Sequence, residues 1–156
     1  MQLPSVGSAA PGFSLPNQDA KQLSLADYQG KYLCIYFYPK DDTPGCTIQG
    51  CLFRDHSEQL AKLNCAILGV SVDETNSHIK FRSKFGFEFD LLSDVEHKMA
   101  LDYGIWVEKS MFGRKYMGMQ RSTVLIDPKG TVVKTWEKAD PNSNAQEVLE
   151  YLKLTS

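Results

Sequence analysis

The 156-residue sequence lacks the features that mark secreted, membrane-spanning and nucleic-acid-binding proteins. The first twenty residues contain no apolar run of the kind found in targeting segments. The apolar run Tyr32–Tyr38 is too short to cross a bilayer, which takes about 20 residues. We therefore expect a cytoplasmic protein without membrane contact. The 17 Lys and Arg residues are spread along the chain against 19 Asp and Glu, so the net charge of −2 offers no basic patch for nucleic acid.

Metal-ligand spacing and the Cys-x-x-Cys pair are also absent. The three histidines, His56, His78 and His97, lie in segments with helical patterns and match no metal spacing with the cysteines. We expect them in surface or half-buried positions, and we expect neither a metal ion nor another cofactor. The chain has only four cysteines. In a reducing cytoplasm they favour transient or catalytic sulfur chemistry over structural disulfides.

No repeat, low-complexity tract or linker divides the chain, so residues 1–156 are predicted to form a single domain. Periodicity predicts strands at Tyr32–Tyr38, Ala66–Val72, Phe89–Leu92, Ser122–Ile126 and Thr131–Trp136, and helices at Pro44–Leu63, Thr75–Phe85, Val95–Tyr103 and Ala145–Leu152. Strands linked by helices are parallel neighbours, and the last two strands form a hairpin that adds antiparallel members. The predicted fold class is therefore α/β and thioredoxin-like. It has a mixed central sheet flanked by helices, an irregular or hairpin extension over residues 1–24, and an insertion before the hairpin.

Cys46 stands where the predicted helix Pro44–Leu63 begins, just beyond the carboxyl end of a buried strand. The first N–H groups of a helix lack intrahelical partners, and the helix dipole adds partial positive charge there. Both effects favour the ionised thiolate, which is the reactive form of cysteine. The apolar face of this helix is predicted to comprise Ile48, Leu52, Leu60 and Leu63.

Three other residues have a functional interpretation, and for Thr43 and Arg121 an ordinary structural one stands beside it. Thr43 either caps the helix or turns its hydroxyl toward the thiolate, and the two roles are compatible. Gly45 is small enough to let another molecule approach the backbone beside Cys46. Arg121, which precedes the apolar strand Ser122–Ile126, is either a common charged strand end or a fixed cation that favours the thiolate and holds a polar substrate.

Cys51 follows Cys46 by five residues. In an unbroken helix the two Cα atoms would lie about 8–9 Å apart, beyond the roughly 7 Å limit for a disulfide. Cys51 is therefore either a core-facing helix residue or the partner in a disulfide that forms only after the first turns unwind. Gly50 would make that unwinding easier. Cys34 and Cys65 lie in apolar strand runs and are predicted to be inert core thiols.

The segment from Tyr36 to Thr47, YFYPKDDTPGCT, closely resembles the active-site loop of the peroxiredoxins, whose Pro-x-x-x-Thr/Ser-x-x-Cys pattern it fits as Pro39, Thr43 and Cys46. Further similar segments cover nearly the whole chain: residues 10–13, 27–31, 53–55, 69–71 and 103–104, and Arg121 before its strand. The extended loop is similar to that of the bacterioferritin comigratory, or Q-type, subfamily. From the same resemblance, we expect the N-terminal extension and the insertion to be of the kind found in peroxiredoxins.

The resemblance implies a thiol peroxidase that reduces hydrogen peroxide and organic hydroperoxides. Cys46 would be the peroxidatic cysteine that becomes a sulfenic acid. Thr43 and Arg121 would hydrogen-bond the thiolate and the peroxide oxygens, with the N–H groups around Gly45 at the helix start, and Pro39 would shape the pocket. In one branch of the subfamily the resolving cysteine lies five residues after the peroxidatic one, which matches Cys51.

The resemblance further implies that a 46–51 disulfide is reduced by thioredoxin, with glutaredoxin as the other candidate reductant. The chain ends without the cysteine-bearing tail of dimeric two-cysteine peroxiredoxins, so we expect a monomer. Two other functions compete with a peroxidase. One is a general thiol–disulfide oxidoreductase, which the missing Cys-x-x-Cys pair weakens. The other is a non-catalytic chaperone-like module, which would keep its activity after Cys46→Ser.

Overall fold

The centre of the fold is the strand β3 (Tyr32–Phe37), in a computed structural model that describes residues 2–155. Positions 1 and 156 of the predicted domain lie outside this range. β3 pairs in parallel with β4 (Cys65–Ser71) and antiparallel with β8 (Ser122–Ile126). Its apolar sequence suits this central place, since a strand covered on both faces needs no polar alternation. With β5 (Asp90–Ser93) and β9 (Val132–Trp136), the strand order is β5-β4-β3-β8-β9, which confirms the predicted mixed sheet.

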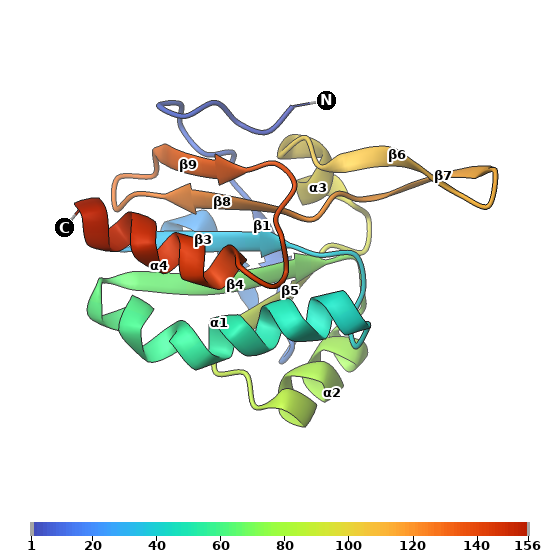
Figure 1. Ribbon diagram of the computed structural model, residues 1–156, viewed down its shortest axis with the longest axis horizontal. Helices are drawn as coiled ribbons and strands as arrows, with labels where there is room; N and C mark the ends of the chain where they lie inside the picture. Colours follow the sequence, from blue (N-terminus) through green and yellow to red (C-terminus); the bar gives the residue numbers. More distant parts are fainter. Residues whose placement is uncertain (1, 156) are drawn as a thin grey trace.

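Helices cover both faces of this sheet (Figure 1). The helices α1 (Pro44–Lys62), α2 (Thr75–Phe85) and α4 (Asn144–Thr155) pack on the face to which Cys34 and Tyr36 point. The short helix α3 (Lys98–Asp102) packs on the opposite face, with the N-terminal segment. That segment forms the small hairpin of β1 (Ser14–Pro16) and β2 (Gln22–Ser24), followed by the 3₁₀ turn η1 (Leu25–Tyr28).

Alternation along β3 divides the core between these two layers. The Tyr36 ring stacks on Phe53 of α1 with centroids 4.6 Å apart, while Phe37 packs against Tyr103 beyond α3 with centroids at 5.3 Å. Burying each large apolar side chain contributes about 1.5–3 kcal/mol, so this packing holds α1 against β3. The beginning of α1, where Cys46 lies, is thereby fixed beside the carboxyl end of β3.

Two details of the predicted helices are wrong. Ile48 is 43% exposed, because α1 faces the sheet through Cys46 and Phe53 together with Leu60, which was predicted correctly. The helix predicted at Val95–Tyr103 is shortened to Lys98–Asp102. His97 before it adopts a left-handed conformation with φ +50°, which cannot continue a helix to its N-terminal side.

A second antiparallel hairpin was not predicted. It consists of β6 (Trp106–Met111) and β7 (Arg114–Met119), and it extends away from the body of the protein as an arm (Figure 1). Its turn residues Phe112 and Gly113 both have positive φ, as a tight two-residue hairpin turn requires. We call residues 106–119 the β6–β7 arm.

Candidate active site

The predicted site residues meet at one end of the sheet, where β3 ends and β8 begins. Phe37 pairs with Ser122, so Arg121 lies beside the loop that leads from β3 to α1. α1 begins at Pro44 and carries Cys46 in its first turn, as predicted. Pro39 is half-buried at a bend of the intervening loop. Two segments 75 residues apart in sequence therefore bring a thiol and a guanidinium together.

The sulfur of Cys46 is in direct contact with Arg121. Arg121 Nη2 donates a hydrogen bond to Cys46 Sγ at 3.3 Å, and Cys46 itself is only 1% exposed. A charge-assisted contact of this kind stabilises a thiolate more than a neutral thiol. A Cβ added at Gly45 would lie 3.0 Å from the same Arg121 nitrogen. Gly45 therefore admits the guanidinium to the sulfur, where the sequence had indicated only room for another molecule.

Thr43 occupies the N-cap position of α1 with extended backbone angles, but its side chain does not cap the helix. Its hydroxyl donates instead to the Lys40 carbonyl at 2.8 Å. The hydroxyl therefore contacts neither the sulfur nor the helix N–H groups in this conformation. Within residues 2–155 no side chain caps the first turn of α1, so its N–H groups remain available beside Cys46.

A buried chain of amides holds Arg121 in place, and the sequence analysis missed it. Arg121 Nη1 donates to Gln49 Oε1 at 2.7 Å, and Gln49 Nε2 donates to Asn144 Oδ1 at 3.1 Å. Thr123 also donates to Asn144 Oδ1, at 2.6 Å. Gln49, Thr123 and Asn144 are all 0% exposed. Gln49 could have been recognised from the sequence, because it lies one helical turn beyond Cys46 and so on the same face of α1.

A second polar cluster fixes the loop before α1 from the other side. Asp41 Oδ1 accepts from Tyr38 Oη at 2.6 Å, while Asp41 Oδ2 accepts from Ser77 Oγ at 2.8 Å and lies 2.7 Å from His78 Nδ1. His78 is 0% exposed, so its predicted surface or half-buried position is wrong. Its other ring nitrogen lies 2.8 Å from the Leu92 carbonyl. The cluster ties the loop to α2 and β5.

Asp41, His78 and the nearby Asp73 are close enough together to hold a metal ion, with ligand atoms within 4.8 Å. Their polar atoms are engaged within the protein, however. Asp73 Oδ2 accepts from the Asp41 backbone N–H at 2.8 Å and from Ser71 Oγ at 2.7 Å. We therefore assign this group to holding the loop in place.

The remaining cysteines lie along the same face of the sheet. Cys51 is half-buried in unbroken α1 and packs against the core, which matches the first of its two readings in this conformation. Cys34 and Cys65 are buried as predicted, at 0% and 5% exposure. Desolvation raises the pKa of Cys34 well above its ordinary value and that of Cys65 to about 12. Both thiols are therefore poorly ionised, in keeping with an inert role.

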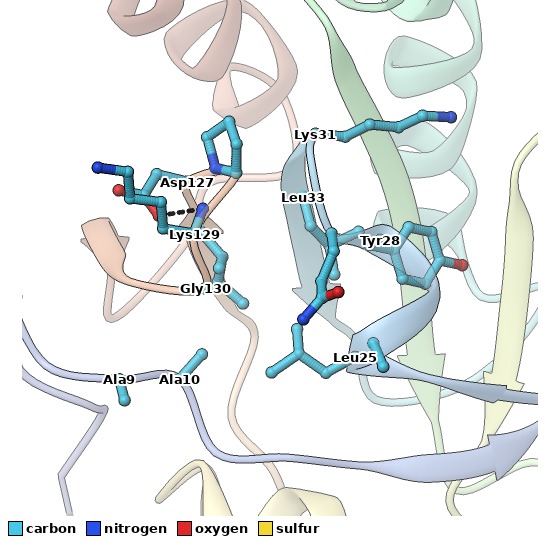
Figure 2. A pocket seen from close by; sticks show the side chains of 13 residues that line it. Ala9, Ala10, Leu25, Tyr28, Lys31, Leu33, Asp127, Lys129 and Gly130 are labelled. Atoms are coloured by element: carbon cyan, nitrogen blue, oxygen red, sulfur yellow. Dashed lines mark hydrogen bonds between the residues drawn. The ribbon is translucent and has the colours of Figure 1, made fainter.

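A cavity of about 320 Å³ lies at the opposite end of the sheet, near the start of β3 and the end of β8 (Figure 2). Leu25 and Leu33 lie across it from the turn formed by Asp127 and Lys129, while the Tyr28 ring points away from that turn (Figure 2). Asp127 Oδ1 accepts a hydrogen bond from the Lys129 backbone N–H at 2.9 Å, a contact that aspartate side chains often make in tight turns. None of the predicted site residues lines this cavity.

Among residues 2–155, no helix combines the length and the apolar character needed to span a membrane. The AhpC/TSA family matches residues 6–135 of the chain. The chain is 45% identical over 148 residues to peroxiredoxin Bcp of Bacillus subtilis, covering 95% of this chain and 94% of that protein. It is 40% identical over 147 residues to peroxiredoxin Bcp of Escherichia coli K12, with 94% of each covered.

Solved structures show the same relationship. A cysteine-to-serine variant of Xylella fastidiosa PrxQ superposes with a TM-score of 0.92 at 34% identity, covering 97% of this chain and 96% of that one. The Xanthomonas campestris bacterioferritin comigratory protein, described for its alkyl peroxide reduction activity, has a TM-score of 0.87 at 36% identity, covering 99% and 97%. The predicted thioredoxin-like fold of the peroxiredoxin type is thereby confirmed.

Proposed function

This chain belongs to the AhpC/TSA family, within it to the Bcp peroxiredoxins, and we propose that its Cys46 thiolate is the group that reduces peroxide. That the chain is a thiol peroxidase follows from the family. The observation that supports Cys46 for this role is the 3.3 Å contact of its sulfur with Arg121 at an uncapped helix start. Cys34, Cys51 and Cys65 have no comparable cation beside them among the described hydrogen bonds and ion pairs.

In the first step, the Cys46 sulfur attacks the nearer oxygen of the peroxide. The O–O bond breaks, the sulfur is oxidised to a sulfenic acid, and an alcohol or water leaves after gaining a proton. Arg121 and the free N–H groups of the first turn, those of Gly45 and Cys46, would stabilise the negative charge that develops on the oxygens. The Thr43 hydroxyl would join them by turning from the Lys40 carbonyl, and Pro39 would shape the pocket.

The depth of Cys46 favours a small peroxide over a protein disulfide as the substrate. A sulfur that is 1% exposed is reached by a hydroperoxide group but not by the disulfide of a folded protein. This burial argues against a general thiol–disulfide oxidoreductase. It also means that any later exchange with another cysteine needs the beginning of α1 to move.

We assign Cys51 to the second step. Its thiol would attack the sulfenic sulfur of Cys46, releasing water and leaving a 46–51 disulfide. The first turns of α1 must unwind for this pairing, since five helical residues hold the Cα atoms too far apart. Gly50 has a packing role as well as low helix propensity, because a Cβ there would lie 2.5 Å from the Phe87 ring.

The disulfide would then be reduced by thioredoxin, with glutaredoxin as the second candidate. We further propose that the protein acts as a cytoplasmic monomer, a single domain without metal or other cofactor. The two cysteines that the cycle needs lie in one helix, so no second chain has to supply a sulfur.

The test couples the protein to NADPH through thioredoxin and thioredoxin reductase, with hydrogen peroxide as substrate. Wild-type protein should consume NADPH only when peroxide is present, and Cys46→Ser should abolish this consumption. Peptide mapping after one equivalent of peroxide should yield a 46–51 linkage. A 46–34 or 46–65 linkage, or full turnover by Cys51→Ser, would contradict the assignment of Cys51. Retained peroxidase activity in Cys46→Ser would contradict the proposal as a whole.

A further inference from the structure

The β6–β7 arm begins directly beside the candidate active site. β7 ends at Met119, and only Gln120 separates it from Arg121. The Gln120 N–H donates to the Ile105 carbonyl at 2.7 Å, which closes the base of the arm where it joins the body. A side chain of the arm that points back toward this base therefore points toward Arg121, which contacts Cys46.

Lys109 leans in that direction. Its opposite partner in the arm is Tyr116, yet its aliphatic stem lies over Gly118, and a Cβ added at Gly118 would sit 3.4 Å from Lys109 Cδ. Gly118 is two residues nearer the base than Tyr116. The absence of a side chain there makes room for the lysine stem. Lys109 is half-buried, in contrast to most of the outer arm.

The ammonium of Lys109 has no hydrogen-bond or ion-pair partner among the described residues. Lys115 on the facing strand differs, because it lies 3.6 Å from Glu108 and is exposed. Two charged groups interact electrostatically with the Lys109 ammonium, Arg121 and the sulfur of Cys46. Desolvation, followed by repulsion from Arg121, lowers the pKa of Lys109, while the Cys46 charge acts in the opposite direction. The lysine is thus a better acid than a free lysine.

The proposed reaction requires a proton at this place. Breaking the O–O bond leaves a strongly basic alkoxide or hydroxide, whose protonation makes it a good leaving group. Guanidinium groups do not serve as proton donors in proteins, so Arg121 supplies charge and hydrogen bonds only. The Thr43 hydroxyl can donate a hydrogen bond after turning from the Lys40 carbonyl, but an aliphatic hydroxyl is too weak an acid to give up its proton. The Tyr36 hydroxyl lies against Gly69 of the neighbouring strand. Lys109 is the titratable cation that remains in electrostatic interaction with the Cys46 sulfur.

We propose that Lys109 is the general acid of the peroxidase reaction, brought to the leaving oxygen by the β6–β7 arm. The Cys46 thiolate attacks the hydroxyl oxygen of ROOH and forms the S–O bond as the O–O bond breaks. The Lys109 ammonium gives one proton to the departing RO⁻, which leaves as ROH, and water returns a proton to the amine. This inference rests on the proposed role of Cys46 as the attacking sulfur.

The test compares two classes of oxidant by stopped-flow measurement of Cys46 oxidation. A hydroperoxide, tert-butyl hydroperoxide, expels a strong base that needs a proton. A peroxycarboxylic acid, peracetic acid, expels a weakly basic carboxylate that does not. We expect Lys109→Met and Lys109→Arg each to slow the oxidation of Cys46 by the hydroperoxide about 100-fold, which is the lower end for general acid catalysis. The rate of oxidation by the peracid should change less than threefold. Lys115→Met, on the same arm, is the matched control and should leave both rates unchanged.

The conservative variant separates proton donation from charge. If Lys109→Arg keeps the wild-type hydroperoxide rate, the lysine contributes charge alone and the inference is overturned. It is also overturned if both oxidants slow by the same factor, or if neither slows. An alkaline loss of the wild-type hydroperoxide rate that disappears in Lys109→Met would support it further. If neither oxidant reacts with Cys46 in the wild-type protein, the proposed function itself fails, which is a distinct result.

Discussion

Replacing Gln49 by leucine should impair both stability and peroxide reduction, because Gln49 links Arg121 to the protein interior. Gln49→Leu removes the 2.7 Å hydrogen bond from Arg121 and the 3.1 Å hydrogen bond to Asn144. A hydrogen bond to a charged group contributes about 1.5–3 kcal/mol and a neutral one about 1 kcal/mol. Arg121 is only half-buried, so water can replace part of the hydrogen bonding that the guanidinium loses. Asn144 Oδ1 keeps its hydrogen bond from Thr123. We therefore expect a loss of about 2 kcal/mol in the free energy of unfolding.

The same substitution frees the guanidinium to leave the sulfur of Cys46. If half to all of that free energy also orients Arg121 in the transition state, the rate of Cys46 oxidation falls about 5- to 30-fold. Urea unfolding and stopped-flow oxidation by hydrogen peroxide measure the two effects separately. Gln59→Leu on the exposed side of α1 is the control, with an expected change within about 0.5 kcal/mol and an unaltered rate. A destabilised Gln49→Leu protein that reacts at the wild-type rate would refute the idea that Gln49 positions Arg121.

Three further predictions concern the other cysteines and the helix that carries the site. Cys51→Ser should undergo the first oxidation step at the wild-type rate but lose most of its thioredoxin-coupled turnover, as single-turnover and steady-state assays would reveal. Cys34 and Cys65 should resist a thiol reagent in the native protein at pH 8, because a pKa of about 12 leaves roughly one Cys65 thiol in 10⁴ ionised, and both should react after unfolding in urea. Gly50→Ala should lower the free energy of unfolding by about 1–2 kcal/mol in a urea titration. Its Cβ overlaps the buried Phe87 ring at 2.5 Å, which outweighs the higher helix propensity of alanine; a more stable variant would contradict this packing.

The parts of the fold that the sequence predicted well are those with a strong local signal. β3 is an uninterrupted apolar run, and α1 begins where Pro44 follows a short polar loop, so both were located within a residue or two. The β6–β7 arm gave no such signal. Most of its side chains are exposed on both faces, so there is no alternation to detect, and its turn depends on Phe112 and Gly113 adopting positive φ.

The candidate site divides in the same way. Cys46 and Arg121 were predicted to act together, and the structure places them in contact. The partners that hold them were missed, because a pairing such as Asp41 with His78 joins segments 37 residues apart and depends on how α2 packs. Lys109 was missed for a related reason. Its position follows from the path of an arm that the sequence did not predict, and from the open space above Gly118.

The central claim is that peroxide oxidises Cys46 and no other cysteine in the first step. The most direct measurement treats the Cys51→Ser protein with one equivalent of hydrogen peroxide in the presence of dimedone, which traps sulfenic acids, and locates the label by mass spectrometry. Without Cys51 to resolve it, the sulfenic acid should persist long enough to be trapped. The account predicts label on Cys46 alone. Label on Cys34 or Cys65, or peroxide consumption with Cys46 unmodified, would contradict it.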